Sequence, residues 1–143
     1  MSTTKTIASL EEMRVWIDQL LQDWGEKHLI VLSGKMGAGK TQLVQLITES
    51  LGAKHVMSPT FSIHNSYDSD RVSIDHVDLY RLDGDGDLES TGFWEMFDQD
   101  QGWVFVEWGD RLDKSIYPRD WPTTFIHLEK IEGNESARQI TIS

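Results

Sequence analysis

The 143-residue sequence contains no cysteine, so disulfide bonds and thiolate metal sites are excluded. A cytosolic protein is the simplest expectation, because disulfides mark oxidising compartments. Long apolar stretches are also missing: no segment approaches the roughly 20 apolar residues that a membrane-spanning helix requires. Residues 1–5 contain no apolar core of a secretion signal. We therefore expect no membrane association.

Positive charge is scarce, with 13 basic against 24 acidic residues and a formal net charge of −11. Nucleic-acid binding draws much of its affinity from lysines and arginines that neutralise phosphates. Tight, direct binding of RNA or DNA by this chain alone is therefore not expected, whereas a basic protein partner would be favoured. The apolar and charged fractions, 38% and 26%, are typical of a globular protein. We expect residues 1–143 to form one domain.

The clearest motif is residues 34–41, GKMGAGKT, which match G-x-x-x-x-G-K-[ST] in full. Glycines let such a loop turn its backbone N–H groups toward a phosphate chain. The lysine then reaches the β- and γ-phosphates, and the hydroxyl that follows can bind Mg²⁺. The motif therefore predicts a nucleotide-binding loop with Mg²⁺ as cofactor. The predicted nucleotide contacts are Met36, Gly37, Ala38, Gly39, Lys40 and Thr41.

The residues around this loop have the pattern that the motif requires. Residues 29–32 form a short apolar run, which favours a buried parallel strand. After the loop, apolar residues at helical spacing continue to Leu51 and stop at Gly52, a suitable residue to follow a helix end. We predict an α/β fold: a P-loop NTPase-like three-layer sandwich with a mixed β-sheet and a C-terminal β-hairpin.

Other segments complete this prediction. Residues 9–12 form a capping box before an amphipathic helix, whose apolar stripe begins at Leu10 and which we expect to end at Gly25. Its Trp16 and Trp24 favour core positions, although this segment could also flank the adenine. Further along the chain we expect a strand over residues 72–79, a solvated acidic loop over 83–87, a short helix over 88–97, and a hairpin formed by 124–131 and 139–142.

A second strong element, residues 102–108, is an apolar run that contains Glu107 near its end. This is the pattern of a Walker-B strand, whose carboxylate emerges beside the P-loop. We therefore expect Thr41 and Glu107 to hold the metal. The group that orients the attacking oxygen is left open among Thr60 and the acidic residues Asp75, Asp78 and Asp83. The five histidines have no metal-ligand spacing, which favours surface or core roles.

Four motifs together resemble a known family. They are residues 34–41, then 58–61 (SPTF), 78–81 (DLYR) and 106–108 (VEW), in this order and at similar spacing to the TsaE (YjeE) family. That family is the ATPase component of bacterial tRNA threonylcarbamoyladenosine biosynthesis. The resemblance implies slow, Mg²⁺-dependent ATP hydrolysis and docking onto a TsaB–TsaD heterodimer that modifies adenosine 37 of tRNA. The tRNA would be contacted mainly through these partners.

The resemblance also implies roles for individual residues. Lys40 and Thr41 correspond to phosphate and Mg²⁺ contacts, and Glu107 to the Walker-B ligand. Thr60 resembles a switch-I threonine, and Asp78 is similar to an aspartate that orients the hydrolytic water. Trp108 matches the family tryptophan, either at the edge of the site toward a partner or as a wedge in the core.

The chain departs from the family pattern at Lys35 and Met36, because the family usually has an acid after the first glycine of the loop. No arginine is obviously placed as a finger in cis among Arg71, Arg81, Arg111 and Arg119. Since such a finger can be worth 10³–10⁵ in rate, we expect weak ATPase activity in isolation. Two alternatives stay open: a small-molecule P-loop kinase and a nucleotide-gated interaction module without hydrolysis.

Overall fold

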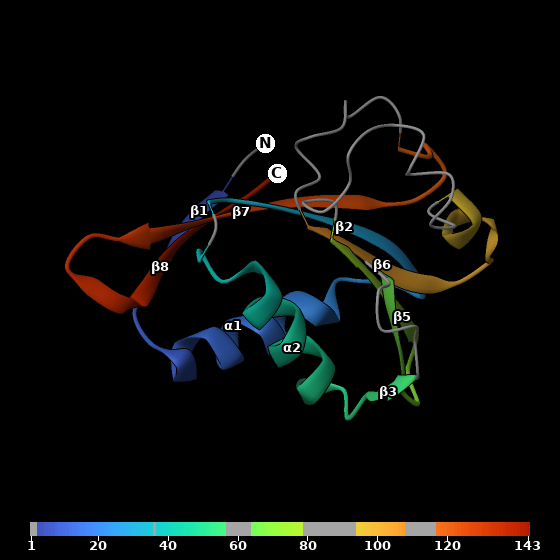
Figure 1. Ribbon diagram of the computed structural model, residues 1–143, viewed down its shortest axis with the longest axis horizontal. Coiled ribbons are helices and arrows are strands. Elements are labelled where there is room, and N and C mark those ends of the chain that lie inside the picture. The colour runs from blue at the N-terminus through green and yellow to red at the C-terminus, as the bar shows by residue number, and fades with distance from the viewer. Residues whose placement is uncertain (1–2, 36, 57–63, 79–93, 108–116) are drawn as a thin grey trace.

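The computed structural model describes residues 3–35, 37–56, 64–78, 94–107 and 117–143 (Figure 1). The elements, in chain order, are β1 (Thr3–Ile7), α1 (Leu10–Gln22), β2 (Lys27–Ser33), α2 (Lys40–Ser50), β3 (Lys54–Val56), β4 (His64–Asp68), β5 (Ser73–Asp78), the 3₁₀ helix η2 (Trp94–Asp98), β6 (Gly102–Glu107), β7 (Thr123–Ile131) and β8 (Asn134–Ile142).

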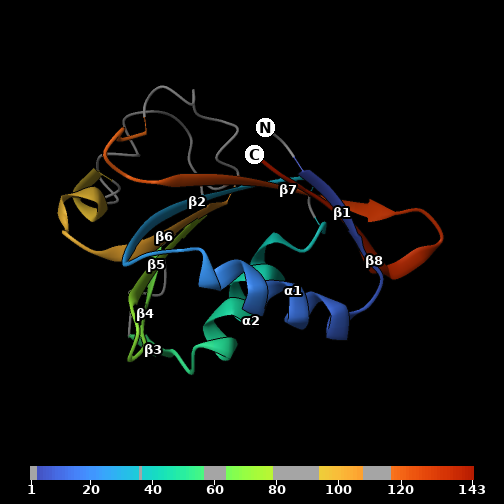
Figure 2. The ribbon, with the colours of Figure 1, turned by 180° about the vertical axis from the view of Figure 1, so that it is seen from behind.

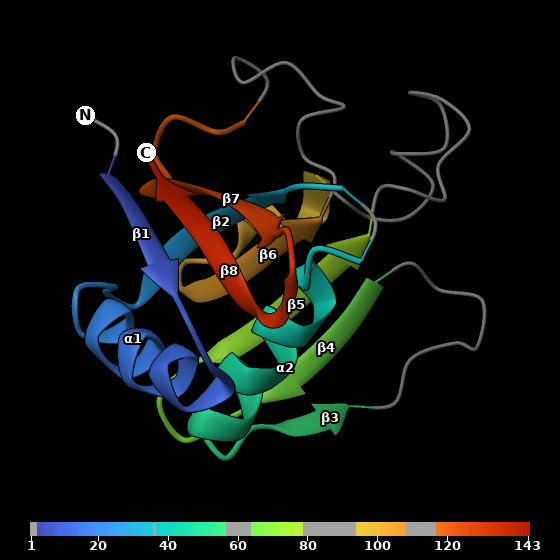
Figure 3. The same ribbon diagram turned by 90° about the vertical axis from the view of Figure 1, so that its left-hand side faces the viewer.

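The strands form one mixed eight-stranded sheet in the order β1-β8-β7-β2-β6-β5-β4-β3. Strands β7, β2, β6 and β5 are parallel to their neighbours within this group, and the remaining pairings are antiparallel. Figure 3 shows how the twisted sheet curves around the helices. The parallel strands end at the same edge, which is where ligands bind in open α/β sheets. The predicted mixed sheet and C-terminal hairpin are confirmed.

The sheet is the middle layer of the fold. Helices α1 and α2 lie on one face (Figures 1 and 2), above a core that includes Ile17, Ile47 and Phe105. The opposite face packs against η2 and the segment before β7, through Phe97 and Trp121 among others. Strand β2 is buried on both faces, because Ile30 and Leu32 belong to the helix-side core and Leu29 and Val31 to the opposite one. This explains its continuous apolar run. The predicted α/β class is confirmed.

The ends of both helices follow the local sequence. The Ser9 hydroxyl accepts a hydrogen bond from the Glu12 N–H at 3.2 Å, as in a capping box. The Glu12 carboxylate accepts one at 2.7 Å from the N–H of Ala8, the residue before the N-cap, instead of from the N-cap itself. At the other helix, Gly52 follows the α2 C-cap with φ of 65°, a left-handed conformation that favours glycine. The prediction that α1 ends at Gly25 was wrong, because the helix ends at Gln22.

Some features were not visible in the sequence pattern. Strand β1 lies at the edge of the sheet, and its residues 3–6 are exposed. Its sequence therefore has no alternating apolar pattern from which a strand could be predicted. Trp16 and Trp24 are buried, as expected for core residues, whereas Leu10 is 45% exposed although it belongs to the predicted apolar stripe. Of the helix expected over 88–97, the described part is the 3₁₀ helix η2. Residues 88–93 and the acidic loop 83–87 lie outside the described residues.

Arg71 connects the sheet to the end of α1. Its guanidinium donates hydrogen bonds to the carbonyls of Leu21 at 2.8 Å and Trp24 at 2.9 Å, and it lies 4.9 Å from the centroid of the Trp103 ring. We expect Arg71→Met to lower the free energy of unfolding by about 2 kcal/mol, because the substitution removes two charge-assisted hydrogen bonds and a cation–π contact. Urea denaturation followed by circular dichroism measures this change.

Arg14→Met is the matched control. Arg14 is exposed and contacts Glu49 at 3.8 Å on the surface, and such pairs contribute about 0–1 kcal/mol. Equal destabilisation by both substitutions would contradict the anchoring role of Arg71.

Candidate functional site

The glycine-rich loop connects β2 to α2 at the carboxyl edge of the sheet. A Cβ atom at Gly34 would lie 2.4 Å from the Leu128 carbonyl oxygen of β7, so only glycine fits there. Gly37 and Gly39 have φ of 85° and 105°, in the left-handed region. Gly39 is also the N-cap of α2. The loop thus brings the N-terminus of a helix, with its unpaired N–H groups and positive dipole end, to the mouth of the site.

Lys40 places a positive charge inside this loop. The residue is 5% exposed, and its ammonium group donates hydrogen bonds to the carbonyls of Gly34 at 2.6 Å and Lys35 at 3.2 Å. The side chain therefore folds back beneath the loop instead of pointing into solvent. The ammonium belongs to the first residue of α2, whose N–H groups also favour an anion, so the two together are suited to binding phosphate.

The next residue joins the loop to the predicted Walker-B strand. The Thr41 hydroxyl lies 2.9 Å from each carboxylate oxygen of Glu107, across 66 residues of sequence. Glu107 is 3% exposed. Strand β6 reaches this position because it pairs in parallel with β2, whose Leu32 is opposite Glu107. The expected proximity of the threonine and the acid is therefore present in the structure.

A histidine that the sequence analysis assigned to a surface or core role also reaches Glu107. His76 is 6% exposed, and its Nε2 lies 2.5 Å from Glu107 Oε2. It projects from β5 on the sheet face that α2 covers, next to the position where Asp78 pairs with Glu107. The missed signal was the H-x-D spacing at the end of this strand, which places His76 and Asp78 on the same face.

The other candidate acids are separated by the alternation of β5. Asp78 pairs in register with Glu107, so it lies at the carboxyl edge near the loop. Asp75 lies on the opposite face, where its carboxylate accepts hydrogen bonds from Ser66 at 3.0 Å and Gln99 at 3.0 Å. Asp75 is thus removed from the candidates that could orient an attacking oxygen. Met36, Thr60, Asp83 and Trp108 lie outside the described residues.

Two cations from the C-terminal hairpin lie against the loop, and motif analysis missed both. The Arg138 Nε donates a hydrogen bond to the Ala38 carbonyl at 2.8 Å. A Cβ atom at Gly37 would lie 3.6 Å from the Lys130 ammonium. The site is therefore locally cationic within a strongly acidic chain. The arginines considered in the sequence did not include Arg138, which is 100 residues from the loop.

A cavity of about 310 Å³ adjoins the loop between the starts of α1 and α2 and the hairpin. Its walls are mainly apolar, with a few polar side chains among them, as in many small-molecule sites. The lining residues include Leu10, Met13, Leu43, Leu46, Leu128 and Arg138. The exposed side chain of Leu10 lies at this cavity, which accounts for its departure from the predicted buried stripe.

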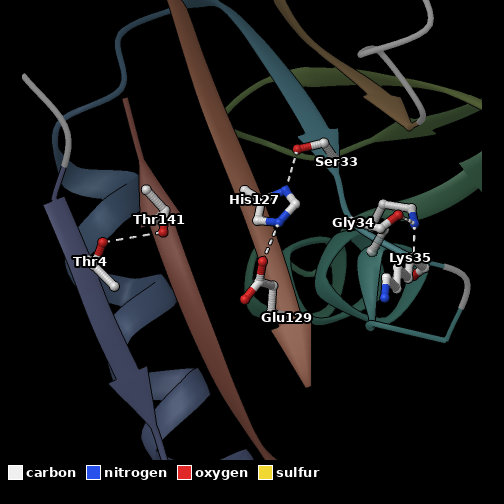
Figure 4. Close-up of polar contacts among 8 residues, drawn as sticks. Thr4, Ser33, Gly34, Lys35, His127, Glu129 and Thr141 are labelled. Atoms are coloured by element: carbon white, nitrogen blue, oxygen red, sulfur yellow. Dashed lines mark hydrogen bonds and ion pairs between the residues drawn. The ribbon is translucent and has the colours of Figure 1, made fainter. Parts of the chain in front are cut away.

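A second hollow, about 480 Å³, lies between the loop and β7, where Lys35 and Lys130 are among its walls. Figure 4 shows His127 on β7 beside the start of the loop. Its ring lies 2.8 Å from the Ser33 hydroxyl and 3.0 Å from the Glu129 carboxylate, so both ring nitrogens have partners. His127 and Glu129 are substantially exposed, with side-chain exposures of 44% and 57%.

The described residues contain no group of three or more histidine and acidic side chains that could hold a metal ion by themselves. A Mg²⁺–nucleotide site does not need such a group, because Mg²⁺ in these sites takes most of its ligands from phosphates and water. The hydroxyl of Thr41 and the carboxylate of Glu107 are hard oxygen donors at the correct place. The residues present therefore fit a magnesium ion held together with a triphosphate.

The mixed sheet, the glycine-rich loop at the end of β2 and the acid at the end of β6 define a P-loop NTPase-like fold. The chain matches the family model described as "Threonylcarbamoyl adenosine biosynthesis protein TsaE" over residues 7–140. It therefore belongs to the TsaE family, which functions in tRNA threonylcarbamoyladenosine biosynthesis.

Relatives named tRNA threonylcarbamoyladenosine biosynthesis protein TsaE support this assignment. The protein from Nostoc sp. (strain PCC 7120) is 35% identical over 118 residues, which are 80% of this chain and 69% of the relative. The Synechocystis sp. (strain PCC 6803) protein is 39% identical over 103 residues, 68% of this chain and 64% of the relative. The chain thus spans about two thirds of the length of these relatives.

The crystal structure of Bacillus subtilis YdiB has the same fold, with a TM-score of 0.64 and 24% identity over 99% of this chain and 84% of that one. Within the described part of the chain, neither helix has the length and apolar character needed to cross a membrane.

Proposed function

We propose that this protein binds ATP with Mg²⁺ and hydrolyses it slowly, as the ATPase subunit required for threonylcarbamoylation of adenosine 37 in tRNA. It would act in the cytoplasm with a TsaB–TsaD heterodimer, which would contact most of the tRNA. The observation that carries the nucleotide part is the contact of the Thr41 hydroxyl with the Glu107 carboxylate beside a complete P-loop. The partner part rests on membership of the TsaE family.

The residues of the site have separate roles in this proposal. The Lys40 ammonium and the first N–H groups of α2 bind the phosphates, and Thr41 and Glu107 hold the metal. Magnesium supplies Lewis-acid charge neutralisation when it is bound. Asp78, at the same edge of the sheet as Glu107, is proposed to orient the attacking water. Thr60 and Trp108 keep the roles that the resemblance implies, as a switch residue and a site-edge residue.

The apolar cavity beside the loop is the proposed site of the base. It adjoins Ala38 and Gly39, so a nucleotide whose phosphates follow the loop can place its ring among Leu10, Met13 and Leu46. We expect Leu10→Ser to weaken ATP binding roughly fivefold, about 1 kcal/mol, because it removes apolar surface from the rim. Inorganic tripolyphosphate should bind unchanged, since it has no base. Isothermal titration with both ligands measures the two affinities.

Val15→Ser is the control for this substitution. Val15 is 56% exposed on the same helix and does not line the cavity. Equal effects of the two substitutions, or a loss of tripolyphosphate binding with Leu10→Ser, would place the base elsewhere.

The proposed activity is tested by incubating the purified protein with labelled ATP, with and without candidate TsaB and TsaD, and then with tRNA. We expect release of free phosphate at a rate far below the typical enzyme value of about 10 s⁻¹, a changed rate with the partners, and threonylcarbamoylated tRNA only when all components are present. A phosphorylated small-molecule acceptor instead of free phosphate would favour the kinase alternative. Modification of tRNA by a hydrolysis-deficient Asp78→Ala variant at the normal rate would favour a gating module.

A further inference from the structure

The buried histidine beside Glu107 has a defined donor role. A carboxylate oxygen only accepts hydrogen bonds, so the His76 Nε2 must carry the hydrogen in its contact with Glu107 Oε2. The ring and the carboxylate are both nearly excluded from solvent, at 6% and 3% exposure. Water therefore does not compete for this contact, and a hydrogen bond between such groups has a strong effect on orientation.

The two hydrogen-bond donors to Glu107, Thr41 and His76, differ in which carboxylate oxygen they contact. The Thr41 hydroxyl is 2.9 Å from both oxygens, so it does not distinguish them. His76 contacts Oε2. The histidine therefore fixes the rotation of the carboxylate about its terminal bond, a torsion that is broad when nothing restrains it. Oε1 remains the oxygen with capacity for a cation.

The strand pairing explains why a histidine is at this position. Asp78 is opposite Glu107 in the parallel β5–β6 ladder, and His76 lies two residues earlier on the same face. An imidazole at this position reaches along the face to the carboxylate, while Asp78 stays at the edge. The donor thus comes from a strand that is paired on both sides, and sites built on such elements hold their geometry better than sites on loops.

We propose that His76 is a positioning residue that sets the orientation of the Glu107 carboxylate for a divalent cation bound with the nucleotide. This inference rests on the proposed function, because it concerns the same metal. It assigns no chemistry to the histidine itself. Supporting groups of this kind change metal affinity by about 10- to 100-fold when they are removed.

The first test measures Mn²⁺ binding to the ATP-loaded protein by electron paramagnetic resonance. We expect His76→Leu to weaken Mn²⁺ binding by about tenfold, with ATP affinity in EDTA within about twofold of the wild type. His76→Gln, whose amide N–H can replace the Nε2 donor, should restore most of the Mn²⁺ affinity. His28→Gln is the matched control, because His28 is also buried but contacts Thr124 at 2.7 Å at the far end of β2.

Normal Mn²⁺ affinity in His76→Leu would overturn the proposal. So would an equal loss of metal-free ATP affinity, which would indicate a purely structural role, or equal effects of the leucine and glutamine variants. Thermal unfolding of each variant accompanies the titrations.

A second measurement needs neither nucleotide nor metal, and so separates this inference from the proposed function. Long-range ¹H–¹⁵N correlation spectra report which ring nitrogens of a histidine carry hydrogen. We expect a protonated Nε2 at His76 in the wild type and a changed Nε2 shift in Glu107→Gln. An unprotonated Nε2 would overturn the inference even if the protein binds ATP. A protonated, Glu107-dependent Nε2 in a protein that fails to bind ATP would count against the proposed function alone.

Discussion

Glu107→Gln is expected to lower the rate of Mg²⁺-dependent ATP hydrolysis by on the order of 100-fold. Glutamine preserves the shape of the side chain and can still accept a hydrogen bond from the Thr41 hydroxyl, but it removes the negative charge that would hold the metal. ATP binding in EDTA should be nearly unchanged. Single-turnover release of labelled phosphate measures the rate, and isothermal titration measures the affinity.

Glu129→Gln provides the control for this substitution. Glu129 is an exposed acid on β7 that contacts His127 at 3.0 Å, outside the Thr41–Glu107 pair. We expect it to retain the wild-type rate. If Glu107→Gln retained more than half of the wild-type rate, the assignment of Glu107 to the metal site would be wrong.

Lys40→Ala is expected to weaken ATP binding by on the order of 100-fold, or about 2.8 kcal/mol. The reason is that a buried ammonium can make two or more charge-assisted hydrogen bonds to phosphate oxygens, each worth about 1.5–3 kcal/mol. The loss of ATP affinity should be present with and without Mg²⁺. Glu107→Gln, in contrast, should leave ATP affinity in EDTA nearly unchanged. Isothermal titration measures the affinity, and circular dichroism verifies folding.

Lys35→Ala tests whether any lysine of the loop has this effect. Lys35 is exposed, so its charge is screened by solvent and we expect at most a few-fold change. Unchanged ATP affinity in Lys40→Ala, or an equal loss in Lys35→Ala, would remove the basis for placing the phosphates within the loop.

The sequence predicted the parts of the site that depend on local pattern. Residues 29–52 specify a strand, a loop and a helix without any tertiary information. The signals are the apolar run, the glycine spacing after it and the helical stripe that follows. The proximity of Thr41 and Glu107 also followed from the sequence. An acid at the end of a buried parallel strand emerges at the carboxyl edge of the sheet, where the glycine-rich loop also lies. Both features are present in the structure.

The remaining parts of the site depend on strand pairing and were not predicted. His76 acquires its contact only through the register of β5 against β6. Arg138 reaches the loop because the C-terminal hairpin continues the sheet beside β2. A single lysine, arginine or histidine in a strand has no periodic signal, so its neighbours cannot be inferred before the sheet order is known. The cavity near Leu10 likewise forms from segments that are far apart in the chain.

The most direct test of the nucleotide site is a crystal structure of the protein with a non-hydrolysable ATP analogue and Mn²⁺, with the metal located by its anomalous signal. We expect the triphosphate on the backbone N–H groups of residues 37–42, the Lys40 ammonium on its outer phosphates, and the metal bound to the Thr41 hydroxyl beside the Glu107 carboxylate. A metal bound away from Thr41 and Glu107, or phosphates outside the glycine-rich loop, would contradict this assignment.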